Sequence, residues 1–201
     1  MRHLTHPVVV VTARGKKPGP PRGMTLSSFT TLRLQPTPLV TFNVATPSHA
    51  LDAVLSDPEG LFNVHILTAS RNGVAVAKAF AAGAEEAAAG FEELLRPHQR
   101  DRPGPPDMTH PQGRKGAVMC VLRCRLAKDE MPENGGIVRI QGALGGQAIV
   151  VGEVLKINYA TKSRPTALAY MDRQYRGTGN VLVDPNLGSK KERPTSEESE
   201  S

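Results

Sequence analysis

The chain has 201 residues, and its 25 Lys and Arg against 19 Asp and Glu give a formal net charge of +6. This length fits one domain that can bury a real core. Aromatic residues make up only 4% and Trp is missing, which argues against a nucleic-acid surface built on base stacking. No run of 18 apolar residues predicts a membrane span, and the N-terminus lacks the apolar segment of a signal peptide. We therefore expect a cytoplasmic protein.

The two cysteines, Cys120 and Cys124, lie four residues apart in an expected strand. They would be roughly 13 Å apart on one face of that strand, too far for a mutual disulfide. This usage fits a reducing compartment. The sequence has no Cys-x-x-Cys or paired-His signature, so we expect no metal site.

The first half of the chain predicts strands followed by one short helix. The β-branched run at residues 7–13 is typical of a buried strand, and a basic Pro-Gly loop follows at residues 15–22. Further strands are expected over residues 24–34 and 39–45. Ser48 can cap a helix that runs to about Ser56, where the sequence Asp-Pro-Glu-Gly ends it.

The second half alternates helix, loop and strand. Residues 61–67 read as a half-buried strand with His65 on its polar face or in a subunit contact, and residues 68–95 are rich in helix. A Pro-rich loop at 96–116 precedes strands at 117–127 and 148–157, and residues 186–201 have too little apolar content to fold. We predict a mainly β protein with α elements (α+β), a small Greek-key barrel with appended short helices, in one domain over residues 1–180.

A hydroxyl-rich run follows Gly23 and includes Thr25, Ser27 and Ser28. Hydroxyls and main-chain N–H groups beside a glycine suit a phosphate. Alternatively, the same residues form a half-buried strand with its polar side in water.

The order of these segments resembles the flavin reductase family, whose domain is an FMN-binding split β-barrel. The resemblance covers roughly residues 7–178 and rests on Thr25, Ser27, Ser28, Phe29, Pro38, Phe42, Asn43 and Ser48. It implies a homodimer with FMN at the subunit interface, NAD(P)H as the hydride donor, and a flavin-dependent monooxygenase as a further partner. Relatives usually carry a helix before the first strand, so an organelle-targeted form with a longer N-terminus stays an alternative.

The resemblance also implies which residues bind the cofactor, FMN or alternatively FAD. They are Thr25, Leu26, Ser27, Ser28, Asn43, Val44, Ala45, Thr46, Ser48, His49, Lys78 and Phe80. Arg71 is a weaker candidate, and Lys78 is equally well explained as an ordinary solvated charge on a helix.

One position departs from the family pattern. Many flavin reductases have Gly-Asp-His before the last long strand, with the His beside the nicotinamide, whereas this chain has Gly145, Gly146 and Gln147. Gln147 can form hydrogen bonds but cannot carry a proton. Tyr170 and Tyr175 match the closing pattern of the family, and the resemblance implies that they border the nicotinamide or seal the barrel.

Three functions remain open from the sequence. The first is an NAD(P)H-dependent flavin reductase, in which the flavin carries the hydride step and no catalytic residue is certain. The second is an FMN-binding protein with weak or no turnover, which Gln147 supports. The third, remote, is a basic barrel that binds single-stranded nucleic acid through Phe29, Phe42 and Phe62.

Overall fold

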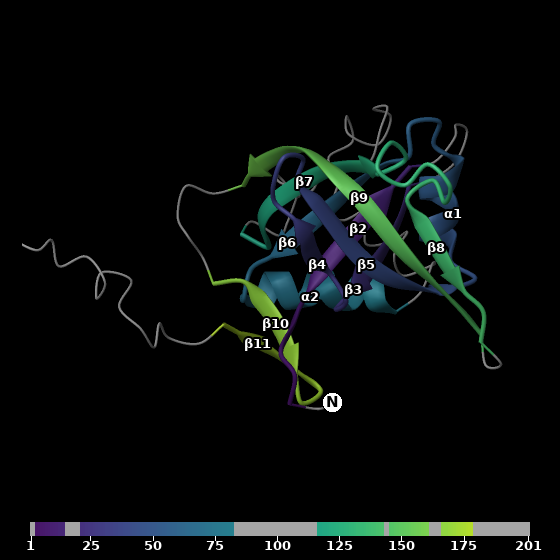
Figure 1. Cartoon of the computed structure of the whole chain (residues 1–201). Helices are drawn as coiled ribbons and strands as arrows, with labels where there is room; N and C mark the ends of the chain where they lie inside the picture. The colour runs from purple at the N-terminus through teal and green to yellow at the C-terminus, as the bar shows by residue number, and fades with distance from the viewer. Residues whose placement is uncertain (1–2, 15–20, 83–115, 143–144, 161–165, 179–201) are drawn as a thin grey trace, which may run out of the picture.

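The computed structural model describes residues 3–14, 21–82, 116–142, 145–160 and 166–178. Within these residues the protein is mainly β with two helices, α1 (His49–Ser56) and α2 (Arg71–Ala81), which confirms the predicted fold class (Figure 1). A small antiparallel sheet contains β1 (His6–Pro7), β10 (Leu168–Met171) and β11 (Gln174–Gly177). The large sheet runs, in spatial order, β3 (Arg22–Leu26), β2 (Val9–Ala13), β6 (Leu61–Leu67), β7 (Val118–Leu126), β9 (Gly146–Tyr159), β5 (Leu39–Thr46) and β4 (Thr30–Arg33), with β8 (Ile137–Ile140) paired to β9.

The large sheet curls into a half-barrel because β9 pairs with two strands in succession. Its first half pairs with β5 and its second half with β7, so that Gly152 lies opposite both Val40 and Leu126. A side chain at position 152 would overlap the ring of Phe62. Glycine there lets Phe62 fill the inside of the curve, where it meets Phe42 edge to face at 5.7 Å.

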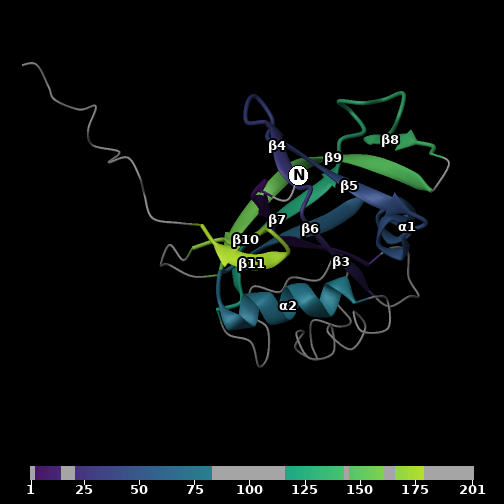
Figure 2. The same cartoon turned by 90° about the horizontal axis from the view of Figure 1, so that it is seen from below.

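Both faces of the central strands are buried, which explains the unbroken valine run at the N-terminus. Val9 and Val11 pack inside the half-barrel, whereas Val8 and Val10 pack on its outside against α2. Figure 2 shows α2 lying across this outer face.

Each helix begins at a serine whose side chain caps it. Ser48 Oγ accepts the Leu51 N–H at 3.3 Å, as predicted, and Ser70 Oγ accepts the Gly73 N–H at 3.0 Å. Phe80 anchors the far end of α2 in the core.

Several sequence expectations need correction. Residues 7–13 divide at Val8 between β1 and β2, which belong to different sheets, and the strand expected over 24–34 breaks at residues 27–29. Strand β8 was missed. Strand β6 is buried on both faces rather than half-buried: His65 is fully buried and its Nε2 lies 2.9 Å from Thr12 Oγ1.

The two cysteines match their expectation, and several other expectations fall on residues that the structure does not describe. Cys120 and Cys124 are both free and buried. Among the described residues there is no cluster of metal-binding side chains, and none of the helices within these ranges is long and apolar enough to cross a membrane. Residues 83–95 of the stretch expected to be rich in helix, residues 96–115 of the Pro-rich loop and the tail at 186–201 lie outside the described residues.

Candidate functional site

Residues 27–29 cross from one edge of the large sheet to the other. Strand β3 forms one edge and β4 the opposite edge, so this short crossing closes the half-barrel; we call the region the seam. Ser28 fastens it, because its Oγ accepts the Asn43 N–H at 2.9 Å and donates to the Asn43 carbonyl at 3.2 Å. The hydroxyl-rich run predicted from the sequence therefore lies where two sheet edges meet.

The main chain of Ala45 is open at the seam. Along an antiparallel strand, the N–H and C=O of alternate residues point to the same side. Ser28 binds both the N–H and the C=O of Asn43, and these two groups point to the β4 side of the strand. The N–H and C=O of Ala45 therefore point to the same side. They lie beyond the last residue pair of β4 with β5, Thr30 and Thr41. The end of β5 thus offers one donor and one acceptor to a ligand.

Gln147 lies directly opposite Ala45 in the pairing of β5 with β9. Because the Ala45 groups point away from β9, this is a pair without mutual hydrogen bonds, in which the two side chains are close together. Both residues are exposed. The structure therefore brings Gln147 to the seam, beside the open main chain of Ala45.

The hydroxyls of Thr25 and Ser27 have different surroundings. Thr25 Oγ1 donates to the carbonyl of Ala77 at 2.7 Å, which ties β3 to α2. Ser27 is exposed, and its hydroxyl makes no hydrogen bond within the described part of the chain. Of the two, Ser27 has the hydroxyl that can donate to a ligand.

The other predicted residues on β5 and α1 contribute unequally. The Val44 side chain is buried in the core, and its main chain pairs with Ala148 of β9. The Ser48 hydroxyl caps α1, and His49 is exposed at the first turn. Thr46 closes the strand, where a side chain at Gly146 would overlap its hydroxyl.

Lys78 and Phe80 lie on α2, next to the carbonyl that accepts from Thr25. Lys78 is exposed, which suits a solvated charge and also leaves it accessible to a ligand. Phe80 is 3% exposed and packs beneath the helix. Its side chain therefore supports the site from within the core.

A small hollow of about 150 Å³ adjoins the hydroxyl run. It is lined by Thr25, Leu26 and Ser27 on one side and by Tyr170 and Tyr175 on the other. The two tyrosine rings pack edge to face with centroids 5.3 Å apart. Burial raises the pKa of the Tyr175 phenol, and the neighbouring Tyr170 raises it further.

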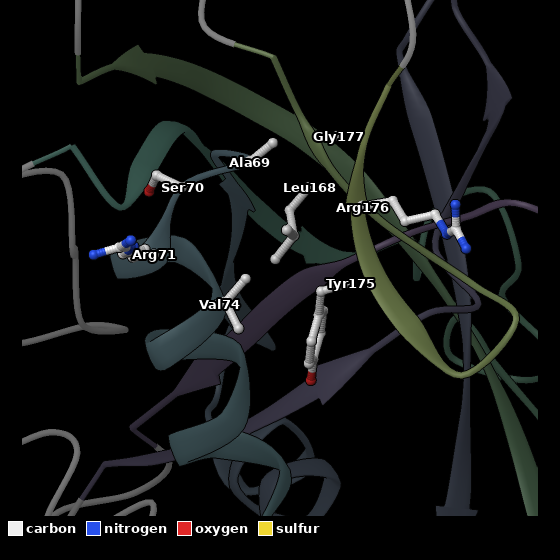
Figure 3. Close-up of a pocket in the computed structure, with 8 residues that line it drawn as sticks. All are labelled: Ala69, Ser70, Arg71, Val74, Leu168, Tyr175, Arg176 and Gly177. Atoms are coloured by element: carbon white, nitrogen blue, oxygen red, sulfur yellow. The ribbon is translucent and has the colours of Figure 1, made fainter.

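A larger hollow of about 320 Å³ lies between the start of α2 and the β10–β11 hairpin. Val74, Leu168 and Tyr175 form its apolar part, with Arg71 and Arg176 on opposite sides (Figure 3). Tyr175 lines both hollows.

The predicted nicotinamide-side residues do not lie together. Tyr170 and Tyr175 line the small hollow beside Thr25 and Ser27, whereas Gln147 pairs with Ala45 at the start of β9, a strand drawn apart from β10 and β11 (Figures 1 and 2). Sequence reasoning also missed Leu168 and Val74 as lining residues. Arg176 stood beside a tyrosine already singled out, and that position was its only signal.

An apolar row runs from the seam across the inner face of the sheet. The register aligns Leu26, Val9, Ile66, Cys120 and Tyr159 on five neighbouring strands. Leu26 and Val9 pack in the core, but at the other end Tyr159 is 72% exposed and its strand neighbour Ile157 is 47% exposed. We call this open end of the half-barrel the mouth.

The phenylalanines on which nucleic-acid stacking depends are directed elsewhere. Phe42 and Phe62 are buried in the core, and Phe29 packs against it. These rings offer no stacking surface, so the nucleic-acid reading loses its main support.

Comparisons with known proteins identify the family and the fold. A family model described as "Flavin reductase like domain" matches residues 1–179. Among solved structures, nitrilotriacetate monooxygenase component B from Mycobacterium thermoresistibile is similar at 20% identity and a TM-score of 0.62, covering 98% of this chain and 90% of that one. The flavin reductase HpaC complexed with NADP+ gives 23% identity, a TM-score of 0.62, and coverage of 89% and 93%. The NADH:FAD oxidoreductase SgcE6 from Streptomyces globisporus is similar at 21% identity and a TM-score of 0.60, covering 90% of this chain and 85% of that one. At these identities the structures show a shared fold.

Proposed function

The chain belongs to the flavin reductase-like domain family, and from that premise we propose that it binds FMN at the seam and passes hydride from NADH or NADPH to the flavin. The observation that carries the proposal is the open main chain of Ala45 beside the exposed hydroxyl of Ser27. The polar edge of a flavin ring carries both hydrogen-bond donors and acceptors, and Ala45 offers the complementary pair. The residues present therefore fit the cofactor.

The protein's own part in the reaction is binding and orientation. A bound flavin supplies the hydride-accepting chemistry. Ala45 would hold the ring, Ser27 would donate to the polar chain of the cofactor, and Ser28 would keep the crossing in place. Gln147, opposite Ala45, would form hydrogen bonds at the ring without exchanging a proton.

The identity of the cofactor is tested by soaking purified protein in FMN, removing free flavin, and recording the visible absorption spectrum. We expect the wild-type protein to retain the yellow colour and Ala45→Pro to lose it. Proline removes the main-chain N–H at residue 45, and its ring blocks the close approach of the flavin to this part of β5. Equal retention of FAD would favour the alternative cofactor. Protein that stays colourless with both would contradict the proposal.

Gln147 makes a second function credible on the same fold: an FMN-binding protein with weak turnover. Rapid mixing of the flavin-loaded protein with NADH or NADPH separates the two. Prompt loss of the oxidised flavin absorbance supports the reductase, whereas colour that persists with both donors supports the binding protein.

The family resemblance implies a homodimer, and we further propose that the second copy of the chain covers the mouth. Ile157 and Tyr159 share their face with Leu122 and Cys120, so a partly exposed apolar surface continues directly from the core. The same row reaches Leu26, which lines the small hollow. A partner that extends from the mouth along this row to Leu26 would border the cofactor.

The dimer is tested with Ile157→Glu, matched by Leu55→Glu on α1, since these two apolar side chains have similar exposures of 47% and 42%. The expected result is a monomer for Ile157→Glu only, measured by light scattering. A dimer that survives Ile157→Glu, or a wild-type monomer at micromolar concentration, would exclude the mouth as the interface.

A flavin-dependent monooxygenase that takes up the reduced flavin is the partner we propose. The similarity to a protein named as a monooxygenase component supports it.

A further inference from the structure

Two cations lie directly opposite each other on the outer face of the large sheet. Arg123 of β7 pairs with Lys156 of β9, and both side chains are exposed. Neither forms an ion pair within the described part of the chain. Like charges at opposite positions of neighbouring strands repel each other, which disfavours the pairing. An anionic group that contacts both side chains would relieve this repulsion.

The next charged position on the same face is arranged differently. Arg125 lies two residues farther along β7, its Nε donates to the Glu153 carboxylate of β9 at 2.6 Å, and its Nη2 lies 3.4 Å from Asp129. The described residues thus supply counter-charges to Arg125 and none to Arg123 and Lys156. We call Arg123 and Lys156 the basic pair.

The basic pair lies on the side of the sheet that also carries the β10–β11 hairpin. Val121, two residues before Arg123 on β7, therefore shares its face, and Val121 packs in the same cluster as Leu168 of the hairpin. Figure 2 shows the hairpin beside α2 on this outer side. The chain that follows the hairpin thus starts on the face that carries the basic pair.

The sequence after the hairpin ends in an acidic segment. The family model stops at residue 179, so this segment is not part of the matched domain. Residues 196–201 read Ser-Glu-Glu-Ser-Glu-Ser, which places three carboxylates together without a basic residue. Their charge is complementary to that of the basic pair.

The connection from the hairpin to the acidic segment is long enough to reach the basic pair. Gly177, at the end of β11, lies next to Ala69, and the neighbouring Thr68 N–H donates to the Ala117 carbonyl just before β7. Arg123 is a further six residues along the chain, which is about 20 Å in a strand. About 20 residues separate Gly177 from the acidic segment, and an extended chain of that length spans up to about 70 Å.

We propose that the acidic segment, residues 196–201, binds the basic pair of its own molecule on the outer face of β7 and β9. Ile157 and Tyr159 of β9 alternate to the inner face, so the bound segment leaves the mouth accessible to a second copy. The site is separate from the seam and does not depend on the proposed function.

Carbodiimide cross-linking of the full chain tests this contact. The reagent joins a lysine amine to a carboxylate where the two touch, and mass spectrometry of the digested protein identifies the joined residues. We expect Lys156 joined to a glutamate of the acidic segment. Arg123→Glu should lower the yield of this product roughly tenfold, because the new carboxylate repels the segment. Arg139→Glu, which changes an exposed arginine on β8, is the matched charge control and should change the yield little.

The ionic strength provides a second measurement that needs no variant. Raising it from about 0.01 M to about 1 M shortens the Debye length from about 30 Å to about 3 Å, so the product at Lys156 should be lost. A yield that does not change with salt would overturn the proposal.

The pattern of cross-links decides the remaining alternatives. No product at Lys156, or equal products at the exposed Lys78 and Lys128, would overturn the assigned site. Equal losses in Arg123→Glu and Arg139→Glu would show attraction by net charge alone and would also overturn it. A mixture of nitrogen-15-labelled and unlabelled protein should give products within one copy, whereas products that join the two kinds of copy would overturn binding within one molecule.

Discussion

The seam and the larger hollow form their surfaces from different parts of the chain. At the seam, the ends of β3, β4 and β5 leave main-chain groups without a neighbouring strand, and Ser28 binds those of Asn43. At the hollow, α2 and the hairpin bring together side chains such as Val74 and Tyr175. The seam therefore depends mainly on strand pairing, and the hollow depends on the identity of a few side chains.

Gly73→Ala should have the largest effect on the free energy of unfolding, because it changes the start of α2, which forms one side of the larger hollow. Alanine in a helix normally stabilises by about 1 kcal/mol relative to glycine. Here the added Cβ would overlap the main-chain carbonyl of Thr68, so α2 must shift and we expect a net loss of about 2 kcal/mol. Urea unfolding measures it.

Gly177→Ala is the matched control, because its Cβ would lie 3.3 Å from Ala69 and Thr166 side-chain atoms and needs only small adjustments. If Gly73→Ala proves as stable as the wild type, the start of α2 is not held against Thr68 as the structure shows.

Ser28→Ala should act on the seam and Thr25→Val on its link to α2. Each removes a hydroxyl contact worth about 1 kcal/mol to stability. Only Ser28→Ala removes the hydrogen bonds that hold residues 27–29 beside β5 near Ala45. FMN affinity should therefore fall roughly tenfold in Ser28→Ala and much less in Thr25→Val.

Fluorescence titration with FMN and urea unfolding of both variants give the comparison. Equal losses of FMN affinity would mean that general destabilisation, rather than the position of the crossing, controls binding.

Gln147→His should give the seam a pH dependence that the wild-type residue cannot provide. An imidazole with a pKa near 6.5 becomes charged as the pH falls, and a cation beside the reacting rings should speed hydride transfer. We expect flavin reduction to rise about tenfold below that pH. Gln147→Asn, which does not titrate, should show a flat profile.

Tyr175→Phe should give the smallest effect, on the hollow. The pKa of Tyr175 is raised in the folded protein, first by burial and then by Tyr170. Its neutral phenol thus contributes stability that is present below the ordinary pKa near 10 and is lost as the pH rises through the higher folded value. The free energy of unfolding, measured with urea between pH 9 and 11, should therefore fall less steeply with pH for Tyr175→Phe than for the wild type.

The sequence predicted those features that depend on neighbouring residues. The valine run required a buried strand, and Ser48 marked the start of α1. The break at residues 27–29 could not be read locally, because the strand-like pattern continues from Met24 to Leu34 and only closure of the sheet decides where it stops. The hydroxyl run and Ala45 stay predictions as cofactor-binding residues. The larger hollow could not be predicted locally, because it joins residues about a hundred positions apart.

Strand β9 has a consequence for the assembled protein. It begins at the residues opposite Ala45 and Thr46, and its other end carries Ile157 and Tyr159 at the mouth. If the proposed flavin site and the proposed dimer both hold, one strand lies at the cofactor with one end and at the partner subunit with the other. If flavin binding then strengthens subunit association, association must strengthen flavin binding by the same factor, so that diluting the dimer would release flavin.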